Sequence, residues 1–258
     1  MSIAALIFDV DGTMADTEET HRQAFNAAFL LHELWWDWSR HQYTELLRTS
    51  GGKERIAVYI DSLPLPNAEK KRLKGLAHLV HDTKTRIYGE LIGDGRAPLR
   101  PGVARLLREA RAAGVRLAIA STTTSANAEA LIRAQLGGEA RHWFEVIACG
   151  DLVPRKKPAP DIYTRALGML RLPASACVAF EDSLNGLAAA KAAGLYTVVT
   201  PNFWSAAQDF SAADLVLHSL GDADAPLDAG SAKRLGAPFL SLARVAELHA
   251  AALRGTPA

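Results

Sequence analysis

The chain has 258 residues, of which 49% are hydrophobic and 22% are charged, the composition of an ordinary globular protein. Its 29 basic and 28 acidic residues leave a net charge of +1, so no bulk field would recruit nucleic acid or an anionic membrane. The sequence shows no cationic leader and no run of about 18 apolar residues that could span a bilayer. We therefore expect a cytoplasmic protein without nucleic-acid or membrane partners, a monomer in the first instance and a dimer as the alternative.

The apolar run at residues 3–7 predicts a buried parallel strand. The stretch that follows contains only helical patterns, which lie at residues 21–33, 42–47, 54–62 and 69–88. From residue 99 onward, apolar strand-like runs alternate with single helical patterns. We expect strands at residues 115–120, 144–149, 177–180, 195–200 and 215–217. We expect helices at residues 101–113, 125–136, 161–170, 184–193 and 239–253, and a loop at 221–236.

Single helices between successive strands imply right-handed crossovers and a doubly wound, Rossmann-like α/β fold with a parallel sheet. An α-helical cap domain inserted after the first strand, at residues 16–95, is the simplest account of the helical stretch. Residues 1–15 and 96–258 would then form the catalytic core. The connecting segments at 15–17 and 93–98 are expected to act as hinges that let the insertion move as a lid.

Polar side chains directly follow four successive predicted strands, in the order Asp9 and Asp11, Ser121, Lys157, and Glu181 and Asp182. In an open parallel sheet the ligand crevice lies outside the carboxyl ends of the strands, so these residues are expected to share one pocket. Asp9 and Asp11 would lie on one side of their strand, where like charges repel. A cation, or an anionic substrate held by a cation, would relieve that conflict.

These residue types suit phosphoryl transfer. One carboxylate can attack phosphorus, and a second acid can protonate the departing oxygen and later activate water. Carboxylates from two strand ends suit Mg²⁺, and a hydroxyl and a lysine can bind the remaining phosphate oxygens. No Walker-type glycine-rich phosphate loop occurs in the sequence.

The runs Asp9-Val10-Asp11-Gly12-Thr13, Lys157-Pro158-x-Pro160-Asp161 and Glu181-Asp182-Ser183, together with Ser121, resemble the four motifs of the haloacid dehalogenase superfamily, in its phosphatase branch. The resemblance covers nearly the whole chain. It implies that Asp9 is the nucleophile and Asp11 the general acid/base. Asp11 argues against a true dehalogenase, because dehalogenases lack that aspartate.

The same resemblance implies the ligands of the site. Mg²⁺ would be held by the Asp9 side chain, the Asp11 backbone carbonyl and Asp182, with Glu181 touching the metal through water or lying behind its ligands. The transferred phosphate would be bound by Ser121, Thr122 and Lys157, and Asn185 would line the site. Lys156 does not match the motif position, and we expect it to be solvated.

Substrate choice is expected to reside in the insertion. Gly51–Ile56 opens a predicted helix, where Gly52, Lys53 and Arg55 could meet an anion near the positively polarised helix start. A polar loop that leads into a surface helix is the alternative interpretation. The run resembles the cap loop of the CbbY group, which belongs to carbon-fixation operons of the Calvin cycle and acts on sugar bisphosphates such as xylulose 1,5-bisphosphate.

The CbbY resemblance also implies that Glu18, His21 and Tyr43 contact sugar hydroxyls. For His21 the alternative is a surface helix residue, and for Tyr43 it is packing within the cap. We expect Trp35, Trp36 and Trp38 to pack in the cap core.

Two further residue pairs have plain interpretations. His78 and His81 are three apart on a predicted helix, but no further ligand has suitable spacing, so we expect both to face solvent. Cys149 and Cys177 are expected to be buried thiols.

The sequence thus favours a Mg²⁺-dependent phosphatase that hydrolyses a small phosphorylated sugar, in particular a sugar bisphosphate, through an aspartyl-phosphate. A β-phosphoglucomutase-like mutase and a phosphoglycolate phosphatase are alternatives in the same fold. A receiver-like module that merely holds an aspartyl-phosphate is the non-catalytic alternative, although it needs neither a second aspartate nor a lid.

Overall fold

A computed structural model describes residues 3–255 and contains one six-stranded sheet in the order β3-β2-β1-β4-β5-β6, with every neighbouring pair parallel. The strands are β1 (Ala5–Phe8), β2 (Arg116–Ser121), β3 (Phe144–Cys149), β4 (Cys177–Glu181), β5 (Tyr196–Val199) and β6 (Leu215–Val216). Strand β1 lies between β2 and β4, so the chain crosses to both sides of it. This arrangement confirms the predicted doubly wound α/β class.

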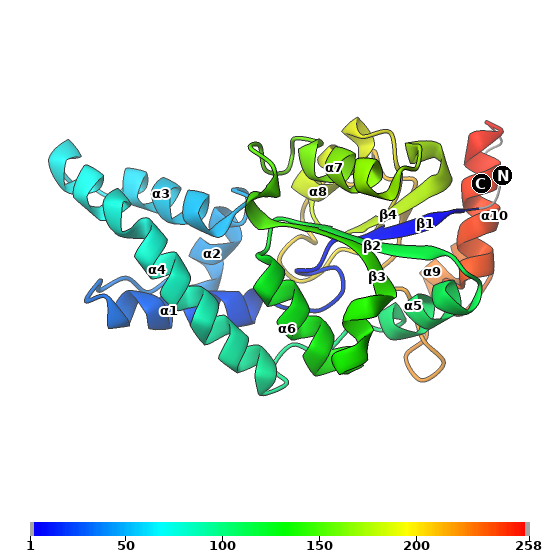
Figure 1. The fold of residues 1–258 in the computed structure, drawn as a ribbon, viewed down its shortest axis with the longest axis horizontal. Helices are drawn as coiled ribbons and strands as arrows, with labels where there is room; N and C mark the ends of the chain where they lie inside the picture. Colours follow the sequence, from blue (N-terminus) through cyan, green and yellow to red (C-terminus); the bar gives the residue numbers. More distant parts are fainter. Residues whose placement is uncertain (1–2, 256–258) are drawn as a thin grey trace.

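Helices cover both faces of the sheet, because strand side chains alternate between the two faces. Leu6 and Phe8 belong to one apolar cluster, and Ala5 and Ile7 to another. The first cluster receives side chains from α5 (Val103–Ala112), α6 (Ser125–Leu136), α9 (Ala229–Leu235) and α10 (Leu242–Leu253). The second receives side chains from α7 (Asp161–Leu170) and α8 (Leu184–Ala192), on the opposite side of the sheet in Figure 1. Short 3-10 helices occupy Gly138–Trp143, Gly150–Leu152 and Ala174–Ala176.

Four helices between β1 and α5 form a separate layer that extends away from the sheet (Figure 1). They are α1 (Glu18–Leu31), α2 (Arg40–Leu46), α3 (Gly52–Ser62) and α4 (Asn67–Gly93). Ala15 and Leu99 pair in an antiparallel bridge, so the chain leaves the sheet and returns to it at neighbouring points. The domain boundaries at residues 15 and 96 stay a prediction.

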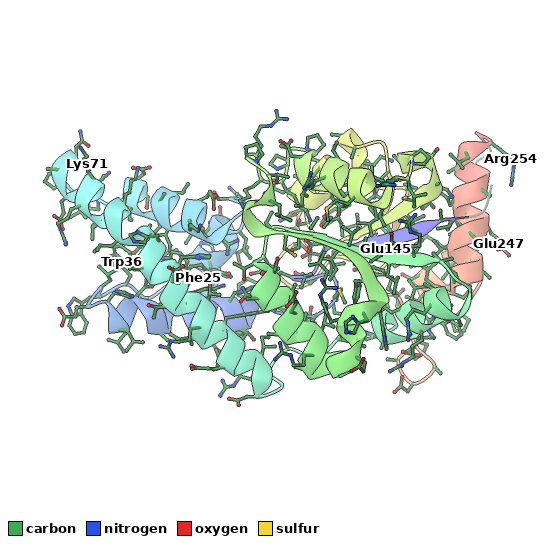
Figure 2. All side chains as sticks on the ribbon, viewed as in Figure 1. Phe25, Trp36, Lys71, Glu145, Glu247 and Arg254 are labelled. Carbon is green, nitrogen blue, oxygen red and sulfur yellow. The ribbon has the colours of Figure 1, made fainter. Side chains whose placement is uncertain are left out.

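The helical layer has an apolar core of its own, in which aromatic rings predominate. Trp38 is fully buried and packs against Phe25 and Phe29, with ring centroids 4.8 and 4.7 Å away. Trp36 also joins this cluster and lies with Phe25 among the helices (Figure 2). Trp35, however, is 87% exposed, so its predicted core position is wrong. Residues 35 to 38 alternate between outward and inward positions, which turns Trp35 to the side opposite Trp36 and Trp38.

The predicted elements differ from the observed ones mainly at their ends. Helix α4, for example, continues to Gly93, beyond the predicted end at 88. The loop predicted at 221–236 is wrong in part, because it contains α9. Asp228 caps this helix by accepting a hydrogen bond from the Ser231 amide at 2.9 Å, and Gly236 ends it in a left-handed conformation.

Two other sequence expectations concern burial and membrane spans. Both cysteines are buried free thiols, as predicted, and burial raises the pKa of Cys149 to about 12. None of the helices within residues 3–255 is long and apolar enough to cross a membrane.

The aromatic core of the helical layer predicts a large effect of one substitution. Trp38→Ala should lower the free energy of unfolding by about 3–5 kcal/mol, because it removes a large side chain that is completely enclosed. Trp35→Ala, three positions away, should change it by less than about 0.5 kcal/mol. Urea unfolding of both variants compares them directly, and equal losses would contradict the enclosed position of Trp38.

Candidate active site

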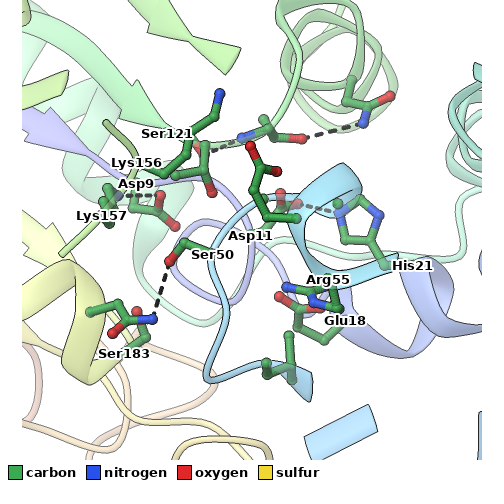
Figure 3. Close-up of a pocket in the computed structure, with 18 of the residues that line it drawn as sticks. Asp9, Asp11, Glu18, His21, Ser50, Arg55, Ser121, Lys156, Lys157 and Ser183 are labelled. Carbon is green, nitrogen blue, oxygen red and sulfur yellow. Dashed lines mark hydrogen bonds and ion pairs between the residues drawn. The ribbon is translucent and has the colours of Figure 1, made fainter. Parts of the chain in front are cut away.

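The loops that follow β1, β2, β3 and β4 meet at one edge of the sheet and enclose a cavity of about 120 Å³ (Figure 3). Its walls come from these loops, from the segment after β5, and from the helical layer, including helices α1, α3 and α4. All but two of the predicted site residues line it, namely Asp9, Asp11, Glu18, His21, Gly52, Lys53, Arg55, Ser121, Thr122, Lys157, Asp182 and Asn185. The exceptions are Tyr43 and Glu181, which lie directly behind lining residues.

Lys157 neutralises two buried carboxylates. Its Nζ lies 2.7 Å from Asp9 Oδ1 and 2.6 Å from Glu181 Oε1, and Tyr163 donates its hydroxyl to the same Glu181 oxygen at 2.6 Å. Burial opposes the charge on Lys157, but the carboxylates of Asp9 and Glu181 raise the pKa of this lysine above its usual value. Burial raises the pKa of Asp9 to about 7, against the opposing effect of Lys157. The pKa of Asp9 is therefore set by the balance between its burial, which raises it, and the charge of Lys157, which lowers it.

A third buried carboxylate, Asp182, completes a cluster of negative charge. Carboxylate oxygens of Asp9, Glu181 and Asp182 lie within 4.8 Å of one another. Burial, followed by the charges of Asp9 and Glu181, raises the pKa of Asp182 well above its usual value. Among the described residues, Glu181 Oε2 has no hydrogen-bond partner although it is buried. A single lysine, Lys157, contacts this group of three carboxylates, and Glu181 Oε2 lacks a hydrogen-bond donor. Such an excess of buried negative charge and oxygen ligands fits a hard divalent cation.

Two glycines let the backbone approach this cluster. A Cβ on Gly12, which has a φ of +80°, would lie 2.2 Å from Asp182 Oδ2. A Cβ on Gly186 would lie 1.8 Å from Glu181 Oε2. Any larger residue at either position would displace a carboxylate.

The Asp11 side chain turns away from the cluster, toward the helical layer (Figure 3). Its Oδ1 accepts hydrogen bonds from Thr17 Oγ1 at 2.7 Å and from His21 Nε2 at 2.9 Å. Burial would raise the pKa of Asp11, but His21 and Thr17 hold it well below the usual range. Asp11 is thus ionised in this arrangement. The metal role implied for its backbone carbonyl stays a prediction.

His21 links Asp11 to a buried lysine. Lys84 Nζ lies 2.6 Å from His21 Nδ1, so Nδ1 accepts and the protonated Nε2 is the atom that donates to Asp11. The imidazole is buried and stacks on Tyr88 with a centroid distance of 4.0 Å. Burial lowers the pKa of His21 and lowers that of Lys84 to about 8. The alternative interpretation of His21 as a surface residue is therefore wrong.

Hydroxyl and amine groups line the opposite wall of the cavity. Ser121 is buried at the end of β2, and its Oγ accepts a hydrogen bond from the Thr123 amide at 3.3 Å. Lys156, which we expected to be solvated, is half-buried; it also lines the cavity and donates to the Gly150 carbonyl at 2.5 Å. Both adjacent lysines, Lys156 and Lys157, therefore line the cavity.

Helix α3 begins at Gly52 and brings basic residues to the cavity. Arg55 is buried and donates to the Tyr43 hydroxyl at 2.8 Å, and that hydroxyl donates to Glu18 Oε2 at 2.9 Å. Tyr43 thus braces two lining residues. Within the described chain Arg55 Nε has no hydrogen-bond partner, which leaves a buried cationic donor beside the cavity.

The prediction that His78 and His81 face solvent holds only for His78. His81 is buried and lines the cavity, and burial lowers its pKa to about 4. Its ring packs closely on Gly52, where a Cβ would lie 2.6 Å from the ring.

Asn185 donates to the Arg48 carbonyl at 2.9 Å and to Ser50 Oγ at 3.1 Å, so it joins α8 to the loop before α3.

Sequence reasoning did not find Thr17, Lys84 and Tyr163. Tyr163 lies two positions after the Lys157-to-Asp161 motif, at the start of a helix, and that proximity was a usable signal. Lys84 carries no local signal, because its contact with His21 spans 63 positions along the chain.

The family model for haloacid dehalogenase-like hydrolases matches residues 3–194. The chain belongs to this family. Protein CbbY of Rhodobacter capsulatus is 54% identical over 83% of this chain and 92% of its own length. The crystal structure of a CbbY mutant from Rhodobacter sphaeroides in complex with xylulose 1,5-bisphosphate is 48% identical, has a TM-score of 0.76, and aligns with 84% of this chain and 94% of its own.

A phosphorylated carbohydrates phosphatase of Thermotoga maritima is 31% identical over 88% of this chain and 91% of its own length. The predicted family is therefore confirmed. This haloacid dehalogenase-like hydrolase is CbbY-like, and it is a phosphoric monoester hydrolase.

The burial of Lys84 predicts a pH-dependent contribution to stability. The folded chain releases the Lys84 proton near pH 8, whereas the unfolded chain holds it to about the ordinary value of 10.5. The unfolded state binds more protons between these values, so the free energy of unfolding should rise with pH there. Relative to Lys84→Met, the wild type should gain roughly 2 kcal/mol between about pH 8 and pH 10.

Urea unfolding of both proteins at several pH values measures this gain. Lys71→Met, at an exposed position of the same helix (Figure 2), is the matched control and should show no such trend relative to the wild type. A pH-independent difference between Lys84→Met and the wild type would show that Lys84 keeps an ordinary pKa.

Proposed function

We propose that this enzyme hydrolyses a phosphorylated sugar, with xylulose 1,5-bisphosphate as the substrate to test first. The observation that supports it most is that a single cavity is lined by Asp9 and Lys157, from the loops at the sheet edge, and by Lys53 and Arg55 from helix α3. A substrate with two phosphates needs two anion sites, and basic groups lie both beside the nucleophile and on the helical layer. The similar CbbY structure contains that bisphosphate.

In the proposed reaction Asp9 attacks phosphorus, the ester oxygen departs, and Asp11 supplies the proton that this oxygen requires. Water then attacks the aspartyl-phosphate while Asp11 takes up its proton, which releases phosphate and regenerates the Asp9 carboxylate. Lys157, with the Ser121 hydroxyl, would bind the phosphate oxygens. Asp11 can act as the acid only after its contact with His21 is lost, because that contact keeps it ionised.

A divalent cation fits the cluster of Asp9, Glu181 and Asp182, and we propose Mg²⁺ because its ligands would all be oxygens. When bound, Mg²⁺ would offset the repulsion between the Asp9 carboxylate and the anionic phosphate.

Asp9→Asn tests the nucleophile. An amide is a very poor nucleophile toward phosphorus, so release of phosphate from an aryl phosphate should fall by more than about a thousand-fold. Circular dichroism and the melting temperature should show a folded protein. Asp224→Asn, at an exposed loop position, serves as the control and should keep wild-type turnover. Substantial turnover by Asp9→Asn would remove the assignment.

Lys53→Ala and Arg55→Ala test the second anion site. Loss of a charge-assisted hydrogen bond to the distal phosphate should lower kcat/KM for xylulose 1,5-bisphosphate by roughly 10- to 100-fold. The value for a monophosphate that lacks this group should change much less, and Lys71→Ala should alter neither. An unchanged ratio between the two substrates would contradict the bisphosphate proposal. Assaying isomerised sugar beside free phosphate separates hydrolysis from a β-phosphoglucomutase-like transfer.

A further inference from the structure

Asn202 lies just after β5 and outside the stretch of residues 3–194 that the family model matches. Its Nδ2 donates a hydrogen bond to Asp182 Oδ2 at 2.7 Å and lies 3.3 Å from the Gly12 carbonyl oxygen. The side chain therefore connects the loop after β5 to both the β1 loop and one of the three clustered carboxylates.

The orientation of the Asn202 amide is fixed by its own loop. Asn202 Oδ1 accepts hydrogen bonds from the Trp204 amide at 2.8 Å and from Ser205 Oγ at 3.4 Å. Because the backbone amide of Trp204 can only donate, Oδ1 must be the atom that faces it. Nδ2 is then the atom that faces Asp182, and exchanging the two would break both contacts.

This contact distinguishes the two oxygens of Asp182. Oδ2 is occupied by Asn202, whereas Oδ1 accepts only a long contact of 3.4 Å from Thr13 Oγ1 among the described residues. The same Thr13 hydroxyl lies 3.4 Å from Asp9 Oδ2. Asp182 Oδ1 is thus on the side of Asp9, where the carboxylate cluster would hold a cation.

A buried arginine holds the backbone from which Asn202 extends. Arg100 donates to the Pro201 carbonyl at 2.9 Å, to the Thr200 carbonyl at 2.5 Å and to the Gly12 carbonyl at 2.7 Å. One guanidinium therefore fixes the loop of Asn202 relative to the β1 loop. The amide reaches Asp182 from a rigid position rather than from a free side chain.

We propose that Asn202 is a positioning residue that presents Asp182 as a one-oxygen ligand to the divalent cation. The inference rests on the proposed cation site and extends it beyond the four family motifs. Without the Nδ2 donor, the Asp182 carboxylate is free to rotate and to turn either oxygen, or both, toward the cation.

Asn202→Ser is the sharpest test. A serine keeps an acceptor for the Trp204 amide, but it is too short to donate to Asp182. Calorimetric titration of the substrate-free protein with MgCl₂ should show a Kd at least about ten-fold above that of the wild type. The Mg²⁺-induced rise in melting temperature should shrink in parallel. At saturating Mg²⁺, kcat should stay within a few-fold of the wild type, so that the metal requirement changes more than the chemistry.

Ser205→Ala is the matched control, since it weakens the same turn and leaves the Nδ2 donor in place. Its Mg²⁺ affinity should equal that of the wild type. Equal affinities of Asn202→Ser and the wild type would overturn the inference, and so would an equal loss in Ser205→Ala. Should Asn202→Ser fail to fold, Asn202→Gln is titrated instead, because its donor is moved by one methylene, and the same ten-fold loss is expected. Absence of Mg²⁺ binding by the wild type would contradict the proposed cation site itself.

Discussion

The site depends on the balance of charge around Lys157. One buried ammonium group contacts Asp9 and Glu181, and the carboxylate of Asp182 lies in the same cluster as those two. Buried charge is stable only where it is paired, and one ammonium group cannot pair with three carboxylates. The site is therefore suited to a cation that would compensate the remaining negative charge. The close packing of these carboxylates also explains the glycines at positions 12 and 186, because a Cβ at either position would overlap Asp182 or Glu181.

The helical layer is connected to this charge cluster through Asp11. This side chain comes from the β1 loop, but its partners Thr17, His21 and Lys84 belong to the helical layer and the segment leading into it. The proton affinity of Asp11 is therefore set by the position of helices α1 and α4. A change in the spacing between the layers would change the acidity of this group before it changed that of Asp9.

The strand ends could be predicted from the sequence because local chemistry and topology agree there. Apolar strands followed by acids, a hydroxyl and a lysine define the sheet edge, and Asp9, Asp182 and Lys157 meet where the fold class requires. Contacts that depend on the packing of distant helices could not be predicted. His81 and Lys84 sit in a polar helix whose buried face is decided by α1 and α3, and α9 was hidden by a loop-like composition.

The bridge between Ala15 and Leu99 gives the chain an entrance and an exit side by side. A segment joined in this way can be exchanged for another without altering the order of the strands. The fold therefore allows the helical layer of one enzyme, with its substrate specificity, to be transferred onto the sheet and catalytic loops of another. The His21 contact sets the condition for such an exchange. A foreign insertion must bring its own hydrogen-bond donor for Asp11, because burial without such a donor would raise the pKa of that carboxyl and favour its protonated form before substrate binds.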